Sequence, residues 1–291
     1  MSASGRAYNA AMTLPKIAKH ETRKISIKRQ AAAQAAANHQ SFEDHLAVEE
    51  PLEIRIHDEP VAITMRTPGD DFALAAGFLF SEGFLKGPKD IGSLRYCENT
   101  QHPELKNVVN LTFASGHKPD LSRLRRNFYA SSSCGICGKA SLEQIKTHAK
   151  PIDAKLKVKL DVIYNLGHSL RKAQTLFEKT GGLHAAGVFD EHGVLYVLHE
   201  DVGRDNAVDK AVGHMLIQDR VPLTHHLLMV SGRASFEIMQ KAVMARIPIV
   251  CAVSAPSSLA VETAREFGVT LVGFLREDDF NVYTHAERIE V

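Results

Sequence analysis

The feature that most constrains the fold is a regular alternation of apolar strands and helices between residues 161 and 275. A long helix is expected over 161–179, because Gly181 and Gly182 follow it as a helix end. The other expected elements are strands at 184–189 and 194–200, a helix at 206–217, a strand at 226–230, a helix at 234–245, a strand at 247–254, a helix at 258–267 and a strand at 269–275. Because these strands are apolar without polar alternation, the sheet should be covered on both faces, as in a three-layer α/β/α domain.

The part of the chain before this domain has a different pattern. The expected elements are strands at 52–56 and 61–67, a helix at 71–85 and a strand at 108–113. The sequence therefore predicts a small N-terminal α+β unit over 46–150, followed by the α/β domain over 151–291.

Residues 1–45 are expected to be an extension outside both units. The stretch KHETRKISIKRQAAAQAAANHQ is basic and then alanine-rich, without an apolar face. This composition predicts a flexible or loosely helical tail, and a polyanion-binding arm is the alternative.

Composition excludes several classes of function. The formal net charge is +1, so bulk charge does not favour nucleic acid or a membrane surface as a partner. We find neither an apolar run of about 18 residues nor the pattern of a secretory signal, which predicts a cytoplasmic protein. In a reducing cytoplasm, a CxxC sequence indicates metal binding or chemistry more often than a structural disulfide.

The stretch SSSCGICGKAS at 131–141 holds two of the four cysteines, Cys134 and Cys137. A capping-box pattern at 141–144 predicts that a helix begins directly after this glycine-rich loop. A helix start and the nearby Lys139 would lower the pKa of a thiol in the loop. Structural zinc, a dithiol redox switch and a thiolate that carries or attacks a group are the three possible roles.

The other cysteines help to choose among these roles. A structural zinc site needs four ligands, and Cys97 and Cys251 are single, with Cys251 in an expected core strand. The CxxC also lacks the thioredoxin context of a preceding central strand. The pattern therefore favours thiolate chemistry at Cys134 and Cys137 and makes Cys97 and Cys251 bystanders.

The stretch GGLHAAGVF at 181–189 has part of a zinc deaminase signature. Those enzymes use H-x-E followed by P-C-x-x-C, whereas here Ala186 stands at the position of the glutamate. The CxxC also precedes His184 instead of following it. The order of elements suits a cytidine-deaminase-like sheet, but without the catalytic residues.

Three strand-to-helix corners carry polar residues, in HEDVGRDNAVDK (199–210), SGRASFE (231–237) and SAPSSLAVE (254–262). Ligands bind at such corners in α/β sheets, and arginines beside helix starts suit anions. The corners predict a site for a phosphate-bearing ligand, although serine and glycine also serve plain helix capping. The aromatic residues of FNVYTH (280–285) could stack on a flat heterocycle or pack as a strand.

These stretches resemble the formate dehydrogenase accessory sulfurtransferase family, often called FdhD. The matching segments, in the family's order, are RTPGDDFALAAGFLFSEG, FYASSSCGICGKAS, GGLHAAGVF, EDVGRDNAVDKAVG, SGRASFEIMQKA, AVSAPSSLAVETAREFGVTLVGFLR and FNVYTHAERI. They cover most of residues 50–289. One departure is Asp205, where the family is expected to have histidine.

The resemblance implies an enzyme that accepts persulfide sulfur from a cysteine desulfurase. It would pass the sulfur to the molybdenum (or tungsten) bis-molybdopterin guanine dinucleotide cofactor, bound as a substrate, before the cofactor enters the formate dehydrogenase catalytic subunit. No metal of its own is implied, and a homodimer is expected. The implied catalytic residues are Cys134 and Cys137. The candidate cofactor-binding residues are Phe280, Asn281, Val282, Tyr283, Thr284, His285, Arg204, Arg233 and Ser257.

Two other functions compete with this sulfurtransferase. One is a non-enzymatic cofactor-binding chaperone for formate dehydrogenase that needs the cysteines only for shape. The other is a zinc hydrolase built on the deaminase-like frame.

Overall fold

The computed structural model describes residues 16–27, 37–98, 100, 103–116, 145–146 and 149–290. The CxxC stretch at 131–141 and the helix start expected at 141–144 lie outside the described residues.

The larger sheet has six strands in the order β13-β12-β11-β10-β8-β9. Its strands are β8 (His184–Asp190), β9 (Leu195–Asp201), β10 (His226–Val230), β11 (Ile249–Ala252), β12 (Thr270–Gly273) and β13 (Asn281–Thr284). The three central strands β10, β11 and β12 run parallel, and β8, β9 and β13 pair antiparallel with their neighbours. The apolar strands expected between 184 and 275 are confirmed.

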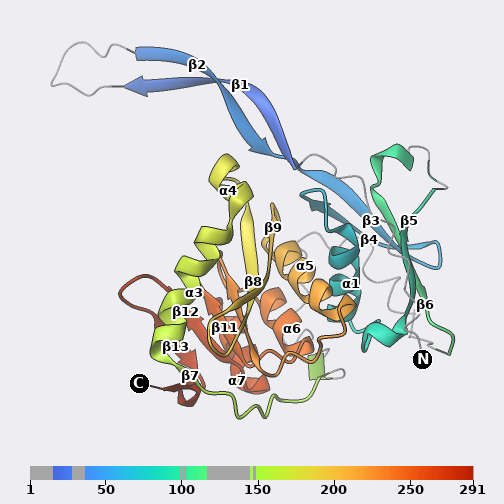
Figure 1. Ribbon diagram of the computed structural model, residues 1–291, viewed down its shortest axis with the longest axis vertical. Coiled ribbons are helices and arrows are strands. Elements are labelled where there is room, and N and C mark those ends of the chain that lie inside the picture. Colours follow the sequence, from blue (N-terminus) through green and yellow to red (C-terminus); the bar gives the residue numbers. More distant parts are fainter. Residues whose placement is uncertain are drawn as a thin grey trace.

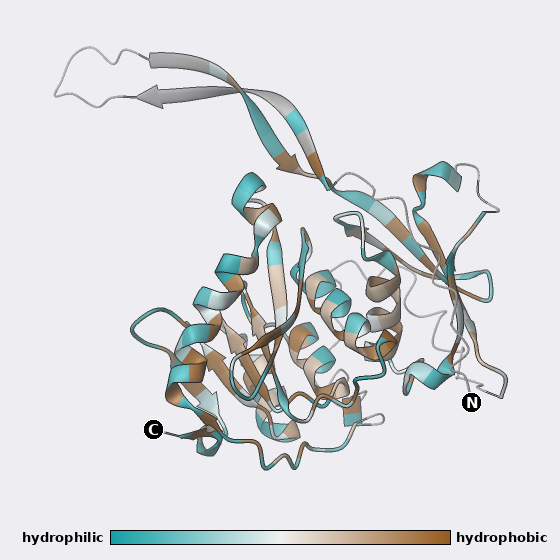
Figure 2. Cartoon of the chain, viewed as in Figure 1, coloured by the Kyte–Doolittle hydropathy of each residue, from teal (hydrophilic) through white to brown (hydrophobic). Residues whose placement is uncertain are grey.

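Helices cover both faces of this sheet, as the sequence predicted (Figure 1). On one face lies α3 (Leu160–Ala173), and on the other lie α5 (Arg204–Ile217), α6 (Phe236–Met244) and α7 (Ser258–Phe267). Alternate residues of β10 divide between the two apolar cores: Leu227 and Met229 pack with α3, whereas Leu228 and Val230 pack with the other helices. The apolar residues gather between the layers and the outer face of α3 is hydrophilic (Figure 2).

The single helix expected over 161–179 is two helices, α3 and α4 (Thr175–Thr180). The carboxylate of Glu200 accepts hydrogen bonds from the backbone N–H groups of Leu176 and Phe177, at 2.9 and 2.7 Å. A carboxylate in this place stabilises a new helix start, which explains the break.

The N-terminal unit is a four-stranded sheet with the order β4-β3-β6-β5 and one helix. Its elements are β3 (Glu50–Ile56), β4 (Glu59–Arg66), α1 (Asp71–Ser81), β5 (Ile91–Tyr96) and β6 (Val108–Phe113). Strand β5 was not predicted. The expected helix over 71–85 ends four residues early because Gly83 takes a positive φ of 79° and the amide of Phe84 folds back onto Leu79 O at 2.9 Å.

Helix α1 packs directly on α5, so the two predicted units share one hydrophobic core. Gly77 of α1 faces the backbone of Asp209, and Gly213 of α5 faces the backbone of Ala73. A Cβ atom at either glycine would overlap these backbone atoms. The two glycines therefore allow the helix backbones to touch, which larger residues would prevent.

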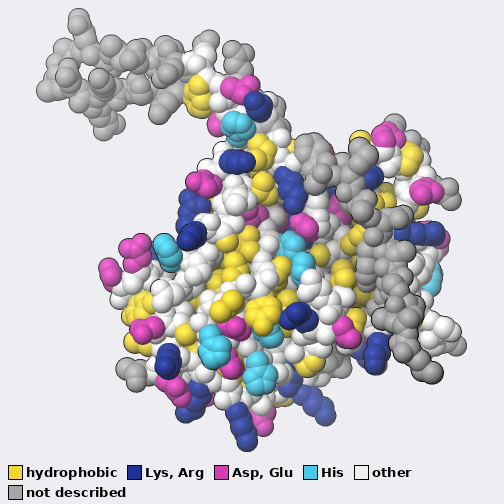
Figure 3. Space-filling model, in the orientation of Figure 1, with side chains coloured by type: hydrophobic (Ala, Val, Ile, Leu, Met, Phe, Trp, Pro, Cys, Tyr) yellow, Lys and Arg dark blue, Asp and Glu magenta, His cyan; other side chains and the backbone are white. Residues whose placement is uncertain are grey.

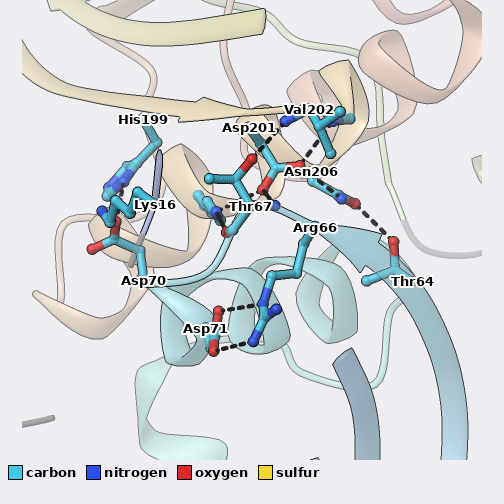
Figure 4. Close-up of polar contacts among 12 residues, drawn as sticks. Lys16, Thr64, Arg66, Thr67, Asp70, Asp71, His199, Asp201, Val202 and Asn206 are labelled. Atoms are coloured by element: carbon cyan, nitrogen blue, oxygen red, sulfur yellow. Dashed lines mark hydrogen bonds and ion pairs between the residues drawn. The ribbon is translucent and has the colours of Figure 1, made fainter. Parts of the chain in front are cut away.

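The tail expected to be flexible or loosely helical over 1–45 contains two strands instead. Strands β1 (Ile17–Ile27) and β2 (Ala37–Ala47) pair antiparallel along their whole length and extend away from the body (Figure 1). The sequence prediction relied on the absence of an apolar face, but hydrogen bonds between the two backbones can form such a ribbon without one. At its base, Lys16 Nζ lies 3.0 Å from a carboxylate oxygen of Asp70, which ties the ribbon to the start of α1 (Figure 4).

Near the C-terminus, the short strands β7 (Val158–Lys159) and β14 (Ile289–Glu290) form a separate parallel pair. Among the described helices, none combines the length and the apolar character that crossing a membrane requires.

A buried ion pair joins α5 to α6 beneath α1. Lys241 Nζ lies 2.8 Å from both carboxylate oxygens of Asp209, and the two residues are 6% and 2% exposed. Burial raises the pKa of Asp209 to about 6, against the effect of Lys241, while Asp209 raises the pKa of Lys241 despite burial. Both groups are therefore charged at neutral pH.

Replacing Lys241 with methionine should lower the free energy of unfolding by about 3–5 kcal/mol near pH 8, because Asp209 would be left as an unpaired buried charge. The loss should shrink near pH 5.5. A carboxyl whose folded pKa is raised above its unfolded value destabilises the folded state as pH rises, and protonation removes that cost. Urea unfolding of the wild type and Lys241→Met at both pH values measures the two losses. An equal loss at both would contradict the argument, and adding Asp209→Asn to Lys241→Met should remove the pH dependence.

Candidate functional site

Three loops lie side by side at the carboxyl ends of β10, β11 and β12. The N–H of Ser254 donates to Gly232 O, and the N–H of Phe274 donates to Ser254 O, both at 3.2 Å. The N–H of Ser257 donates to Ala234 O at 2.9 Å. The corners that the sequence singled out after β10 and β11 are therefore neighbours along one edge of the sheet, where α/β proteins bind ligands.

His184 lies at the same edge, because β8 begins where the antiparallel β10 ends. Ser231 fixes this start: its N–H donates to Ala185 O at 3.0 Å, and its Oγ accepts the N–H of Ala185 at 2.8 Å. A Cβ atom on Gly232 would lie 3.2 Å from His184 Nδ1. The imidazole thus rests against the backbone of the β10 corner.

Two arginines stand beside this histidine. Arg204 is the first residue of α5, with its Nε 3.7 Å from the carboxylate of Asp205, and Arg233 is exposed just after β10. Burial, followed by the charge of Arg204 and then Arg233, lowers the pKa of His184, while Asp205 and Asp201 oppose the shift. The structure therefore brings His184, Arg204 and Arg233 together in a positively charged setting that favours an anion over a metal cation.

Ser257 has a structural role at the third corner. Its Oγ accepts the N–H of Ala260 at 3.2 Å and so caps the start of α7. The alternative of plain capping therefore accounts for this serine, although its side chain is exposed at the same edge.

The segment 280–285 runs from this edge to the opposite one. Asn281 pairs with Gly273 at the corner edge, since β13 runs antiparallel to β12. At the other end, Thr284 Oγ1 donates to Val269 O at 2.7 Å. His285 Nε2 lies 3.2 Å from Arg265 O, at the end of α7. Asn281 therefore lies with the corner residues, and Thr284 and His285 do not.

The two aromatic rings of this segment face opposite sides of the sheet. Phe280 makes an edge contact with Tyr164 of α3, with ring centroids 5.0 Å apart, whereas Tyr283 packs against the core beneath α7. The exposed Val282 lies between them. Because of this placement, Phe280 and Tyr283 cannot stack on the same flat ring. Asn281 itself borders a hollow lined by Phe274, Arg276, Glu277, Asp278 and Asp279.

Three of the six Asp, Glu, Lys and Arg residues in the 199–210 stretch are buried, which the sequence did not reveal; they are Asp201, Asp209 and Lys210. The carboxylate of Asp201 accepts hydrogen bonds from the backbone N–H of Thr67 at 3.1 Å and from Asn206 Nδ2 at 3.0 Å (Figure 4). It also pairs with Lys210 at 2.6 Å, and Lys210 donates to Thr67 O. This network fastens the loop before α1 to the start of α5, and so fixes the position of Arg204.

The same loop is held from its other side. Arg66, which is completely buried, pairs with Asp71 through two contacts of 3.0 and 3.1 Å (Figure 4). The sequence indicated this network only indirectly: its residues come from two charge-rich segments, RTPGDD and EDVGRDN, that both belong to the family resemblance.

The two cysteines outside the CxxC occupy positions that agree with a bystander role. Cys251 is completely buried in β11, and burial raises the pKa of its thiol. Cys97 is half-buried with its Sγ 4.0 Å from Arg55 Nη1. Cys134 and Cys137 lie outside the described residues. Within the described ranges, no group of three or more His, Cys, Asp or Glu side chains could hold a metal ion.

The surface near β8 and β9 carries both apolar and basic side chains. Apolar side chains lie there among lysine, arginine and histidine (Figure 3). The largest exposed apolar residues of β9 and its turn are Val194 and Tyr196, and Arg220 lies over the Tyr196 ring at 5.3 Å.

Comparison with known proteins agrees with the resemblance. A relative from Mycolicibacterium paratuberculosis is 52% identical over 249 residues, covering 84% of this chain and 91% of the relative. One from Streptomyces coelicolor is 53% identical over 252 residues, covering 84% and 89%. One from Saccharolobus solfataricus is 45% identical over 249 residues, covering 84% and 91%. All three are named sulfur carrier protein FdhD.

A solved structure from Desulfotalea psychrophila, described as a formate dehydrogenase accessory protein, has a TM-score of 0.69 to this chain. The two are 25% identical, and the match covers 93% of this chain and 99% of the other. A model of the FdhD/NarQ family matches residues 47–290, which include every corner of the sheet edge and the CxxC. The chain therefore belongs to the FdhD/NarQ family.

Proposed function

We propose that this protein is a sulfur carrier that accepts persulfide sulfur from a cysteine desulfurase and delivers it to a molybdenum bis-molybdopterin guanine dinucleotide cofactor. The observation that carries the proposal is the family match over 47–290, because this range contains Cys134 and Cys137 and because the similar proteins are named sulfur carriers. The name of the D. psychrophila protein supports formate dehydrogenase as the recipient of the cofactor.

Loading needs one thiolate. The thiolate of Cys134 attacks the outer sulfur of the persulfide on the desulfurase, and the sulfur–sulfur bond of that persulfide breaks. The desulfurase cysteine leaves as a thiolate, and Cys134 carries the transferred sulfur as Cys–S–SH. A lowered thiol pKa and an exposed loop both favour this exchange.

Release uses the second thiol. The thiolate of Cys137 attacks the inner sulfur on Cys134, forms a disulfide and expels the outer sulfur as hydrosulfide. The two thiols are oxidised by two electrons while the transferred sulfur is reduced by two, so a dithiol reductant must restore the pair. Soft sulfide is a suitable ligand for the molybdenum of the bound substrate.

The sheet edge suits the nucleotide end of that substrate. Arg204 and Arg233 offer guanidinium groups to a diphosphate, and Asn281 offers an amide to a purine edge. The hollow beside Asn281 is lined by the three acidic residues 277–279 and by Arg276, so acidic groups outnumber basic ones. This balance disfavours phosphate there and suits the donors of a guanine. We therefore assign the phosphates to the arginine side of the edge and the base to the Asn281 side.

The proposal also includes a cytidine-deaminase-like frame, on the strength of the strand order and the helix layers. Ala186 is completely buried in β8 and has no acid–base group, which argues against a zinc hydrolase on that frame. A cytoplasmic homodimer remains part of the proposal.

Mass spectrometry tests the proposed function directly. The purified chain is mixed with a cysteine desulfurase and cysteine, and the peptide containing Cys134 and Cys137 is weighed. A gain of one sulfur atom that a reductant removes is expected. A chain that gains no sulfur, yet still activates a co-expressed formate dehydrogenase, would instead be a cofactor chaperone.

The geometry of segment 280–285 gives a separate prediction. Asn281→Ala should weaken binding of guanosine diphosphate roughly tenfold, which corresponds to about 1.4 kcal/mol, without changing the melting temperature. His285→Ala should lower the melting temperature and leave the affinity for guanosine diphosphate unchanged, because it removes a contact with the end of α7 at the far edge of the sheet. Calorimetry and thermal unfolding of both variants check this contrast. Weaker binding by His285→Ala with an unchanged melting temperature would move the base site to the far edge.

A further inference from the structure

Three nitrogen-bearing side chains at the sheet edge are left without strong partners in the described part of the chain. The imidazole of His184 and the guanidinium of Arg233 have no hydrogen bond or ion pair with any described residue. Arg204 has only the 3.7 Å contact with Asp205. Within the described ranges, the two arginines repel each other and an imidazolium at His184, and a bound anion would offset that repulsion.

We propose that His184 binds the diphosphate of the guanine nucleotide together with Arg204 and Arg233, and that it takes up a proton as it does so. The identity of the ligand rests on the proposed function, whereas the proton uptake rests on the placement of the three side chains. His184 is thereby a binding residue that makes cofactor affinity depend on pH.

The position of His184 supports a direct contact with the ligand. Its ring is exposed at the first residue of β8, and it is held against Gly232, whose added Cβ would lie 3.2 Å from Nδ1 and 4.0 Å from Arg204 Cβ. The imidazole and the root of the Arg204 side chain therefore border the same stretch of backbone. Arg233 follows Gly232 directly, so one diphosphate at this corner could meet all three donors.

The charges around His184 give the direction of the effect. Arg204 and Arg233 disfavour the imidazolium form, and Asp205 and Asp201 favour it, with a net lowering of the His184 pKa that begins with burial. A bound diphosphate cancels the two positive charges and accepts a hydrogen bond from imidazolium, so it raises that pKa. Binding therefore takes up protons, and by linkage an anion that raises the pKa of His184 binds more tightly as pH falls.

The test uses guanosine diphosphate mannose, a diphosphate diester whose charge is constant over the pH range studied. Its dissociation constant is measured by calorimetry between about pH 6 and pH 8.5 for the wild type, His184→Gln and His192→Gln. His192 is a matched control, because it lies in the turn at the opposite end of β8 and its side chain is 78% exposed. Wild type and His192→Gln should bind about tenfold more tightly at the lower pH, and His184→Gln less than twofold.

A second measurement addresses the proton itself. The pKa of His184, followed by NMR, should rise when the ligand is added to the wild-type chain, and calorimetry in two buffers of different ionisation enthalpy should show proton uptake. Equal pH dependence in wild type and His184→Gln, an unchanged His184 pKa, or no binding at any pH would overturn the inference. Persistent sulfur loading in the same preparation would show that only this subsite, and not the sulfur-carrier function, had failed.

Discussion

Replacing Cys134 with alanine should abolish both sulfur loading and the activation of a co-expressed formate dehydrogenase. Only a thiolate can attack the desulfurase persulfide and then carry the sulfur, and alanine supplies neither property. The expected loss is complete within the sensitivity of the assay, because the remaining Cys137 would have to load, carry and release the sulfur alone. The measurements are the mass of the peptide containing residues 134–137 and the formate dehydrogenase activity of cells that produce the variant.

Two other cysteine variants make this result specific. Cys137→Ala should still gain one sulfur atom but should release it slowly, since no second thiol can form the disulfide. Cys97→Ala should load and release sulfur like the wild type, because Cys97 directly follows β5 of the N-terminal unit and its Sγ lies beside Arg55. Full activation of formate dehydrogenase by Cys134→Ala would show that sulfur transfer does not depend on this thiol.

The large sheet could be predicted because its signal is local. Strands β10 and β11 are short apolar runs that are each followed by serine or glycine and then a helix, and β12 is an apolar run that follows α7. Hydrophobic pattern and capping residues therefore agree over this region. The β1–β2 ribbon lacked this agreement, since the sequence of its strands carries many charged residues and no apolar periodicity. Strand β5 was missed for a related reason: its pattern is weak, and its pairing with β6 comes from the fold and not from its own residues.

The candidate site was predictable only in part. Arg233 stands at the corner after the parallel strand β10, where the sequence predicted a ligand-binding edge. Arg204 follows β9, which reaches the same edge because β8 lies between β9 and β10 and runs antiparallel to both. The direction of β13 was not evident from the sequence. Because β13 runs antiparallel to β12, Asn281 and His285 lie at opposite ends of this strand, and only Asn281 lies with the corner residues. The burial of Asp201 and Lys210 also escaped prediction, because a charged stretch looks the same whether solvent or a neighbouring loop surrounds it.

The contact between α1 and α5 should be the most sensitive point of the fold. In Gly213→Ala, the new Cβ would overlap the carbonyl group of Ala73 and lie 2.6 Å from the backbone N of Gly77. Backbone atoms cannot move aside as a flexible side chain can, so the helices must separate and open the core between the two units. We expect a loss of about 3 kcal/mol or more in the free energy of unfolding, which corresponds to a melting temperature lower by roughly 6–12 °C.

Gly167→Ala is the matched control, since it makes the same change inside another helix. A Cβ there would meet only Met229 Cε at 3.8 Å, an ordinary contact. Alanine has the higher helix propensity, so this variant should be more stable than the wild type by up to about 1 kcal/mol. Thermal and urea unfolding measure the change in stability of both variants, which should be a loss for Gly213→Ala and a gain for Gly167→Ala. A similar shift in the same direction would contradict close contact of the helix backbones.

The same substitution should also affect ligand binding. Because α5 begins with Arg204, folded Gly213→Ala protein should bind guanosine diphosphate more weakly while still gaining sulfur at Cys134.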